Sequence, residues 1–195
     1  MPRGPNIDRE SVRKDILEKS TQIVVNDGFE SLNVRKIASQ IGCAVGTIYN
    51  VFKNLDEIVL HINASTLDEI YDIMHKTSSG CDSSIGTIKK LGHCYITFGQ
   101  DNYHLWSMLF EHRLPTSDTP PDWYQEKIDK IFMLISDITA PLYNGDKKKS
   151  MLAATVLWAG LHGVCSLALS GSLKRVKAES ASTLADSLIE NYLSS

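Results

Sequence analysis

The chain has 195 residues, of which 43% are hydrophobic, so it can bury a substantial core and is not an intrinsically disordered protein. Its 20 basic and 23 acidic side chains give a formal net charge of -3 at pH 7, which excludes a generic polycationic coat for nucleic acid. Only the first 53 residues carry a small excess of basic side chains. A polyanion is therefore expected to bind at the N-terminal end.

The cysteines and histidines show no pattern of a metal or catalytic site. Cys43, Cys81, Cys94 and Cys165 lie far apart without a Cys-x-x-Cys pair, which is typical of a reduced compartment. No two histidines have a metal-binding helical spacing, so no catalytic residue, metal or cofactor is expected, and a helical enzyme would need a titratable cluster that only a structure can reveal. The first residues lack the apolar stretch of a secretory signal, so a cytoplasmic protein is expected.

Helical periodicity dominates the chain and no strand-like alternation competes with it, so the fold class is predicted to be all-α. Gly28 stands where the first helix needs a C-terminal cap. Asn33 can cap the second helix, and Leu32 and Ile37 can form a hydrophobic staple across that cap. Helices are expected at residues 8–27, 34–41 (closed by Gly42), 45–51, a longer one that includes Ile58 to Met74, then 85–101, 103–111, 122–142, 150–170 and 182–193, with loops at 77–84 and 113–122.

The second and third helices, joined by a turn that contains Gly42, have the spacing of a helix-turn-helix, whose second helix enters the major groove of DNA. Many helical hairpins share this spacing, so the pattern alone leaves DNA binding open. Ile37, Ile48 and Phe52 have the placement of core residues in a three-helix unit.

The same segment resembles the signature of the TetR family of transcriptional regulators, which runs I-A, G-V-S-x-G-T-L-Y-x-x-F, K. The resemblance implies a helix-turn-helix module at residues 8–56, followed by a helical ligand-binding and dimerisation domain at residues 57–195. It also implies a regulator, expected to be a repressor, that binds a palindromic double-stranded DNA operator as a homodimer and responds to a small-molecule effector. The matching residues are Ile37, Ala38, Gly42, Gly46, Thr47, Ile48, Tyr49, Phe52, Lys53, Leu55, Glu57 and Ile58.

The resemblance gives the DNA-contacting residues their roles. Thr47, Tyr49 and Lys53 are expected to hold phosphates, with a further phosphate contact from Arg35. Gly46 lets the backbone approach DNA, and Val45 and Asn50 face base edges. Without the family match, an exposed tyrosine and lysine on one helix face would be ordinary solvated surface.

Two features depart from the family pattern. Ala44 occupies a position where the family usually has a serine or threonine that caps the recognition helix, a loss of about 1 kcal/mol. Residues 42–52 also carry no charge, so this helix has no arginine for bidentate recognition of guanine. Contacts of Ala44 or Val45 with thymine methyl groups and of Asn50 with adenine remain, which favours a site rich in A and T.

An apolar stretch at residues 151–169 is long enough to span a bilayer, and no charged side chain lies between Lys149 and Lys174. A membrane-anchored helical protein with a span near residues 150–170 is therefore the alternative. Against it, the stretch contains His162 and two glycines, and the amphipathic helix at 182–193 would have no soluble partner. A helix that is apolar on every side is also typical of a buried core helix, and no membrane contact is expected.

Residues 158–163, Trp-Ala-Gly-Leu-His-Gly, resemble the W-x-x-x-H-G motif of one class of TetR-family C-terminal domains, and residues 105–110 resemble another of its stretches. In the TetR family, the last two long helices pair with their copies in a second subunit as a four-helix bundle. The resemblance therefore implies a homodimer. Its expected contact residues are Leu161, Cys165, Leu184, Leu188, Ile189 and Tyr192.

The family resemblance also implies a ligand pocket among the middle helices, where large apolar and aromatic side chains are concentrated, so a hydrophobic effector is expected. For His162 the alternative is a core histidine bonded to a neighbouring helix, and the tryptophans can simply be packing residues. The candidate residues are Tyr95, Phe98, Trp106, Met108, Phe110, Trp158 and His162.

Overall fold

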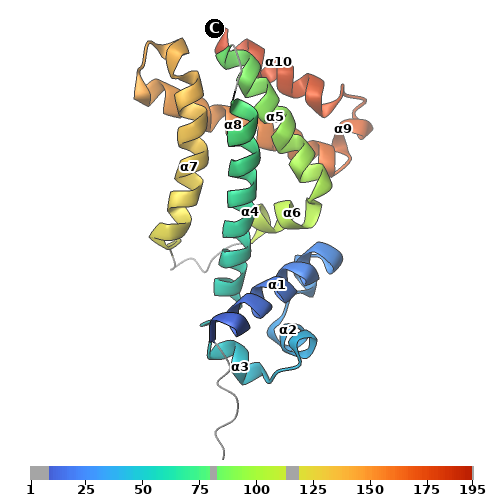
Figure 1. Cartoon of the computed structure of the whole chain (residues 1–195). Coiled ribbons are helices and arrows are strands. Elements are labelled where there is room, and N and C mark those ends of the chain that lie inside the picture. Colours follow the sequence, from blue (N-terminus) through green and yellow to red (C-terminus); the bar gives the residue numbers. More distant parts are fainter. Residues whose placement is uncertain (1–8, 80–82, 113–118, 195) are drawn as a thin grey trace, which may run out of the picture. The chain divides into compact units, whose positions relative to one another are not determined.

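A computed structural model describes residues 9–79, 83–112 and 119–194, and within these ranges all regular structure is helical (Figure 1). The expected loop tips at 80–82 and 113–118, together with Cys81, lie outside the described residues. The chain divides into two compact units. The first comprises Met1–Thr66 with His104–Thr119, and the second comprises Leu67–Tyr103 with Pro120–Ser195.

The first unit is built on a hydrophobic core to which every one of its helices contributes. Its elements are α1 (Arg9–Asp27), the 3-10 turn η1 (Phe29–Ser31), α2 (Val34–Ile41), α3 (Val45–Tyr49), the N-terminal part of α4 (Leu55–Ser78) and α6 (Tyr103–Glu111). The α6 helix follows α5 in the chain but packs here, because Leu105 and Met108 lie in this core. Its fully buried side chains include Ile16, Ile23, Val24, Ile37, Ile48, Phe52, Ile58, Val59 and Met108.

Caps set the bounds of α2 and α3. The Asn33 side chain accepts a hydrogen bond from the Lys36 amide at 2.9 Å, and Gly42 ends α2 in the left-handed conformation, with a φ of 76°. Ala44 precedes α3 and offers no side-chain acceptor. The third helix ends at Tyr49, two residues earlier than its pattern predicts.

The second unit contains the rest of α4, α5 (Ser84–Asp101), α7 (Asp122–Thr139), η2 (Ala140–Tyr143), α8 (Lys147–Leu169), the short α9 (Ser172–Arg175) and α10 (Ala181–Leu193). The α8 helix packs against α7, α5 and α10. A side chain at Gly92 would lie only 3.2 Å from both Leu161 and Ile189, so this glycine lets α5 come close to α8 and α10.

Local chemistry explains where the observed bounds differ from the pattern. The α7 helix gives way at Thr139 to a 3-10 turn that contains Pro141, because proline lacks the amide a continuing helix needs. The α8 helix begins at Lys147, three residues earlier than predicted, because the Asp146 carboxylate caps the amides of Lys148 and Lys149.

The cap difference between the two short helices can be measured. Asn33→Ala removes the acceptor for the Lys36 amide and should lower the free energy of unfolding by about 1 kcal/mol. Ala44→Ser supplies the acceptor that α3 lacks and should raise it by a similar amount. Thermal and urea unfolding followed by circular dichroism would measure both. A destabilising Ala44→Ser would show that the backbone before α3 does not suit a capping side chain.

Candidate functional site

The α3 helix presents one face to solvent and one to the core. Ile48 is buried beneath it, whereas Val45 and Asn50 are exposed and 53% of the Tyr49 surface is accessible. Thr47 is half-exposed, and the space above Gly46 is open. The residues that the sequence assigns to DNA thus form one uncharged surface.

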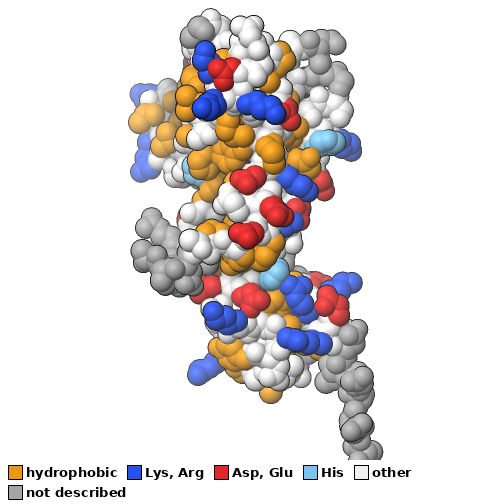
Figure 2. Space-filling model, turned by 90° about the vertical axis from the view of Figure 1, so that its left-hand side faces the viewer, with side chains coloured by type: hydrophobic (Ala, Val, Ile, Leu, Met, Phe, Trp, Pro, Cys, Tyr) orange, Lys and Arg blue, Asp and Glu red, His pale blue; other side chains and the backbone are white. Residues whose placement is uncertain are grey.

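Two basic side chains predicted to hold phosphates flank this segment in the chain, and both are exposed. Arg35 is on α2, and Lys53 follows α3 in the turn to α4. On the face of the first unit drawn in Figure 2, basic side chains lie beside hydrophobic ones. An uncharged helix surface with cations beside it suits contact with base edges and phosphates together.

A reciprocal cap that the sequence analysis missed holds Lys53. The Asn54 side chain accepts a hydrogen bond from the Glu57 amide at 2.9 Å, and the Glu57 carboxylate accepts one from the Lys53 amide at 2.6 Å. The pair is similar to a capping box at the start of α4, except that the carboxylate accepts from the residue before the cap. Its signal, Asn-x-x-Glu before an apolar run, is present at residues 54–57.

The α1 helix also holds the end of α3, through two arginines that the sequence analysis did not single out. Arg9 donates a hydrogen bond to the Asn50 carbonyl oxygen at 3.2 Å. The Arg13 guanidinium lies 2.8 Å from His61 Nε2 and 5.2 Å from the centre of the Phe52 ring. Because arginine can only donate, His61 Nε2 is the acceptor, so the imidazole is neutral. Burial, and then the Arg13 charge, lower the His61 pKa below its usual value of 6.5 against the opposing effect of Glu57.

Four of the seven residues predicted to bind the effector lie in the second unit. The Tyr95 hydroxyl and His162 Nδ1 are 2.9 Å apart, linking α5 to α8. The Trp158 ring stacks on the His162 ring with centroids 5.7 Å apart, and Phe132 meets Trp158 edge to face. Burial lowers the His162 pKa, which favours the neutral imidazole.

Tyr95 and Phe98 also line a narrow crevice between α4 and α5, whose cavity volume of about 0 Å³ does not admit a water molecule. Typical ligand pockets measure about 300 to 1,000 Å³, so this crevice is closed to a ligand as it stands. A ligand would have to displace flexible side chains such as Met74 to enter it. The crevice is lined by Ile70, Ile73, Met74, Cys94, Tyr95 and Phe98.

The other three predicted effector residues belong to the first unit. Met108 is completely buried in the core of that unit, so its role there is packing. Trp106 and Phe110 form a ring pair with centroids 5.1 Å apart. The expectation that all seven residues share one set of middle helices therefore needs correction. The α6 helix is separated from α5 only by Asn102, and proximity in sequence does not show which core its apolar side chains enter.

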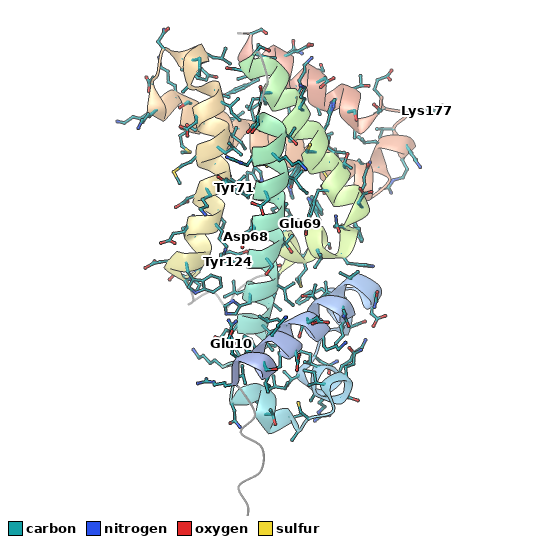
Figure 3. All side chains as sticks on the ribbon, in the orientation of Figure 1. Glu10, Asp68, Glu69, Tyr71, Tyr124 and Lys177 are labelled. Atoms are coloured by element: carbon teal, nitrogen blue, oxygen red, sulfur yellow. The ribbon has the colours of Figure 1, made fainter. Side chains whose placement is uncertain are left out.

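Two cations of α7 contact the second half of α4. Lys127 lies 2.6 Å from the Asp68 carboxylate, and the Lys130 ammonium is 5.6 Å from the centre of the Tyr71 ring. Asp68 and Tyr71 are labelled on α4 in Figure 3, with the buried Tyr124 on α7. These two contacts hold the second half of α4 against α7.

Half of the predicted dimer contacts are buried inside the protomer. Leu161, Cys165 and Ile189 have little or no exposed surface, and burial raises the Cys165 pKa to about 11. Leu184, Leu188 and Tyr192 are half-buried. The apolar stripe of α10 packs against α5 and α8 of its own chain, so it does not need the external partner that the sequence suggested.

The exposed apolar surface lies on the opposite face of α8. Leu152 is 62% exposed, Val156 is 38% exposed and Leu167 is 48% exposed, with Ala159 between them. These four residues recur at helical spacing, and we call them the outer face of α8. By length and composition α8 could also cross a membrane, since it has 23 residues with a mean hydropathy of 1.7 in its most apolar window. Core helices of soluble proteins share these properties.

Comparison with known proteins identifies the family. Residues 88–192, more than half of the chain, match the family described as "Tetracyclin repressor-like, C-terminal domain". The chain belongs to the TetR family of transcriptional regulators. The family, the all-α fold and the helix-turn-helix regulator predicted from the sequence are thereby confirmed, whereas the W-x-x-x-H-G class stays a prediction.

Two related sequences are described as regulators. The HTH-type transcriptional regulator Rv0681 of Mycobacterium tuberculosis is 19% identical over 171 residues, which cover 88% of this chain and 76% of the relative. The fatty acid metabolism regulator protein of Bacillus subtilis is 30% identical over 61 residues, 31% of each chain.

Solved structures share the fold over nearly the whole chain. The regulatory protein SCO4313 superposes with a TM-score of 0.76 and 20% identity, covering 100% of both chains. FadR of Bacillus subtilis in complex with stearoyl-CoA gives a TM-score of 0.62 and 17% identity, covering 93% of this chain and 98% of FadR.

The two half-buried histidines, His61 and His162, predict a pH-dependent stability. The unfolded chain titrates near pH 6.5, whereas the folded pKa values of His61 and His162 are lower. Below pH 6.5 the unfolded state therefore binds more protons, and the free energy of unfolding should fall as the pH drops, by at most about 1.4 kcal/mol per pH unit for each histidine.

Urea unfolding between pH 5 and 8 would measure this dependence. His61→Gln keeps an acceptor for Arg13 but cannot titrate, so its stability should vary less with pH than that of the wild type. An equal pH dependence in His61→Gln and the wild type would exclude His61 as a contributor.

Proposed function

We propose that the protein is a homodimeric, cytoplasmic repressor that binds a palindromic DNA operator and is released by an apolar effector. The observation that carries the DNA-binding part is the division of α3 into a buried side at Ile48 and an exposed, uncharged side at Val45, Tyr49 and Asn50. In this proposal the exposed side enters the major groove. Thr47, Tyr49, Lys53 and Arg35 hold phosphates, and Gly46 allows close approach.

The dimer rests on α8. Its inner face is buried in the protomer at Leu157, Leu161 and Cys165, and its outer face exposes a second apolar stripe. Leaving this stripe in water is unfavourable, because roughly 25 cal/mol is gained for each Å² of apolar surface buried. A second copy would cover it with an identical surface, as in a symmetric dimer. The interface we propose is thus the outer face of α8, with the half-buried Leu184, Leu188 and Tyr192 at its edge.

The effector part rests on the apolar crevice at Tyr95 and Phe98 and on the nearby aromatic cluster at Trp158 and His162. The crevice is closed in this structure, and a slim alkyl chain would displace fewer of its side chains than a broad ring system. Similarity to Bacillus subtilis fatty-acid regulation supports this class: a relative is described as a fatty acid metabolism regulator protein, and the FadR structure contains stearoyl-CoA. We therefore propose an effector with a long apolar chain.

The proposed DNA contacts are of two kinds, those that determine affinity for any DNA and those that determine sequence choice. With Lys53 and Arg35 on phosphates in each half-site, a dimer neutralises about four phosphates, and the log-log salt slope should be roughly -3 to -4. Lys53→Ala should weaken binding to every sequence and flatten the slope by about one to two units. Asn50→Ala should instead cost roughly 1 to 3 kcal/mol at one base position per half-site.

Fluorescence anisotropy with a duplex selected by the wild-type protein from a random pool, and with a scrambled duplex, would make both measurements. If both variants fold and bind both duplexes as tightly as the wild type, the assignment of residues 33–53 to DNA is wrong.

The dimer interface can be tested with two matched lysines. Val156→Lys places a charge in the middle of the outer face of α8 and should yield monomers that remain folded. Met133→Lys replaces a similarly exposed apolar residue on α7, 48% exposed, and should leave the dimer intact. Sedimentation velocity without detergent distinguishes these states. A dimer unchanged by Val156→Lys would move the interface elsewhere, and a wild-type protein that needs detergent would favour the membrane alternative.

A further inference from the structure

The α3 helix cannot hold its own shape. It has five residues, begins without a side-chain cap and contains Gly46. Isolated helices of this length are unstable in water, because the cost of nucleation is not recovered by so few hydrogen bonds. Its position must therefore come from contacts with other parts of the first unit.

One such contact is made at the C-terminal end of α3. Asn50 is the capping residue there, and the Arg9 guanidinium donates to its carbonyl oxygen at 3.2 Å. The last carbonyl groups of a helix lack partners within the helix and carry the negative end of the helix dipole. A cation that donates to this carbonyl therefore stabilises the end of the helix.

A second contact lies one helical turn further along α1. Arg13 is four residues after Arg9, so both side chains leave α1 on the same face. Arg13 packs over the ring of Phe52, which is almost completely buried, and bonds to His61 on α4. The α1 helix thus contacts the chain at Asn50 and Phe52, in the segment that directly follows α3.

We infer that Arg9 and Arg13 are positioning residues for base recognition: by fixing the backbone of Asn50 and the ring of Phe52, they set the direction in which the Asn50 side chain meets the DNA. This inference rests on the proposed function, in which Asn50 faces a base edge. Arg9 is accordingly a determinant of sequence choice. Its main effect comes through the protein backbone and not through neutralisation of a phosphate.

The test compares Arg9→Ala with Lys14→Ala, which removes the same charge from an exposed position on α1 without a bond to α3. Arg9→Ala should bind the selected duplex roughly three- to tenfold more weakly, which is the range for the net contribution of a typical hydrogen bond. Its binding to the scrambled duplex and its salt slope should match those of Lys14→Ala. Arg9→Lys, which keeps the charge but not the planar fork, should recover only part of the loss.

If Arg9→Ala instead weakens binding to both duplexes equally, flattens the salt slope by about one to two units and is fully rescued by Arg9→Lys, then Arg9 is a phosphate contact and the inference fails. The inference also fails if Lys14→Ala discriminates between the selected and the scrambled duplex as poorly as Arg9→Ala does.

Hydrogen exchange in the free protein tests the inference without DNA. The amides of Asn50, Val51 and Phe52 bond to carbonyls of α3, so they report on its last turn. Arg9→Ala should increase their exchange several-fold relative to the amides of α2, whereas Lys14→Ala should not. Unchanged exchange would refute the positioning role even if the protein binds DNA. Increased exchange in a protein that selects no duplex would refute the proposed function instead.

Discussion

The constraint on which the second unit depends is the absence of charge along α8. No Lys, Arg, Asp or Glu lies between Lys149 and Lys174, so every side of this helix needs cover. Its own chain covers one side, where Leu157, Leu161 and Cys165 pack against neighbouring helices. The side chains of Leu152 and Val156 cannot form hydrogen bonds with water, so their exposure to solvent is unfavourable. The arrangement of α5, α7 and α10 around α8 follows from this property, and the proposed dimer rests on it as well.

Much of this fold was predictable, because caps and breakers act locally. Asn33 and Gly42 mark both ends of α2, and the structure places those ends at the predicted residues. What covers an apolar stripe was not predictable, because periodicity shows that a helix has an apolar face but not what packs on it. The stripe of α10 at Ile189 therefore suggested a partner subunit, although α5 and α8 of the same chain bury it.

The candidate DNA site also has one part that was predictable from the sequence and one part that was not. Residues on α3 were identifiable because a family signature concentrates them in one short segment. The bond between Arg9 and Asn50 spans 41 residues, and nothing in the local sequence indicates it. Ala44 explains why α3 needs the contact from Arg9, because an alanine at this position cannot cap the helix. A short helix without a cap and without charge gains little order from its own sequence, so α3 is held by the contacts of α1 and by the Asn54 and Glu57 bonds at the start of α4.

The pair formed by Tyr95 and His162 limits what an effector can be. Both groups are polar, they lie among apolar and aromatic side chains, and each satisfies the other at 2.9 Å. Because burial lowers the pKa of His162 and favours the neutral imidazole, Nδ1 can accept a hydrogen bond from the Tyr95 hydroxyl. A ligand that separated α5 from α8 here would break the hydrogen bond between Tyr95 and His162, at a net cost of about 1 kcal/mol. An effector with a polar group can replace this bond, and an apolar chain can extend from that group toward Phe98.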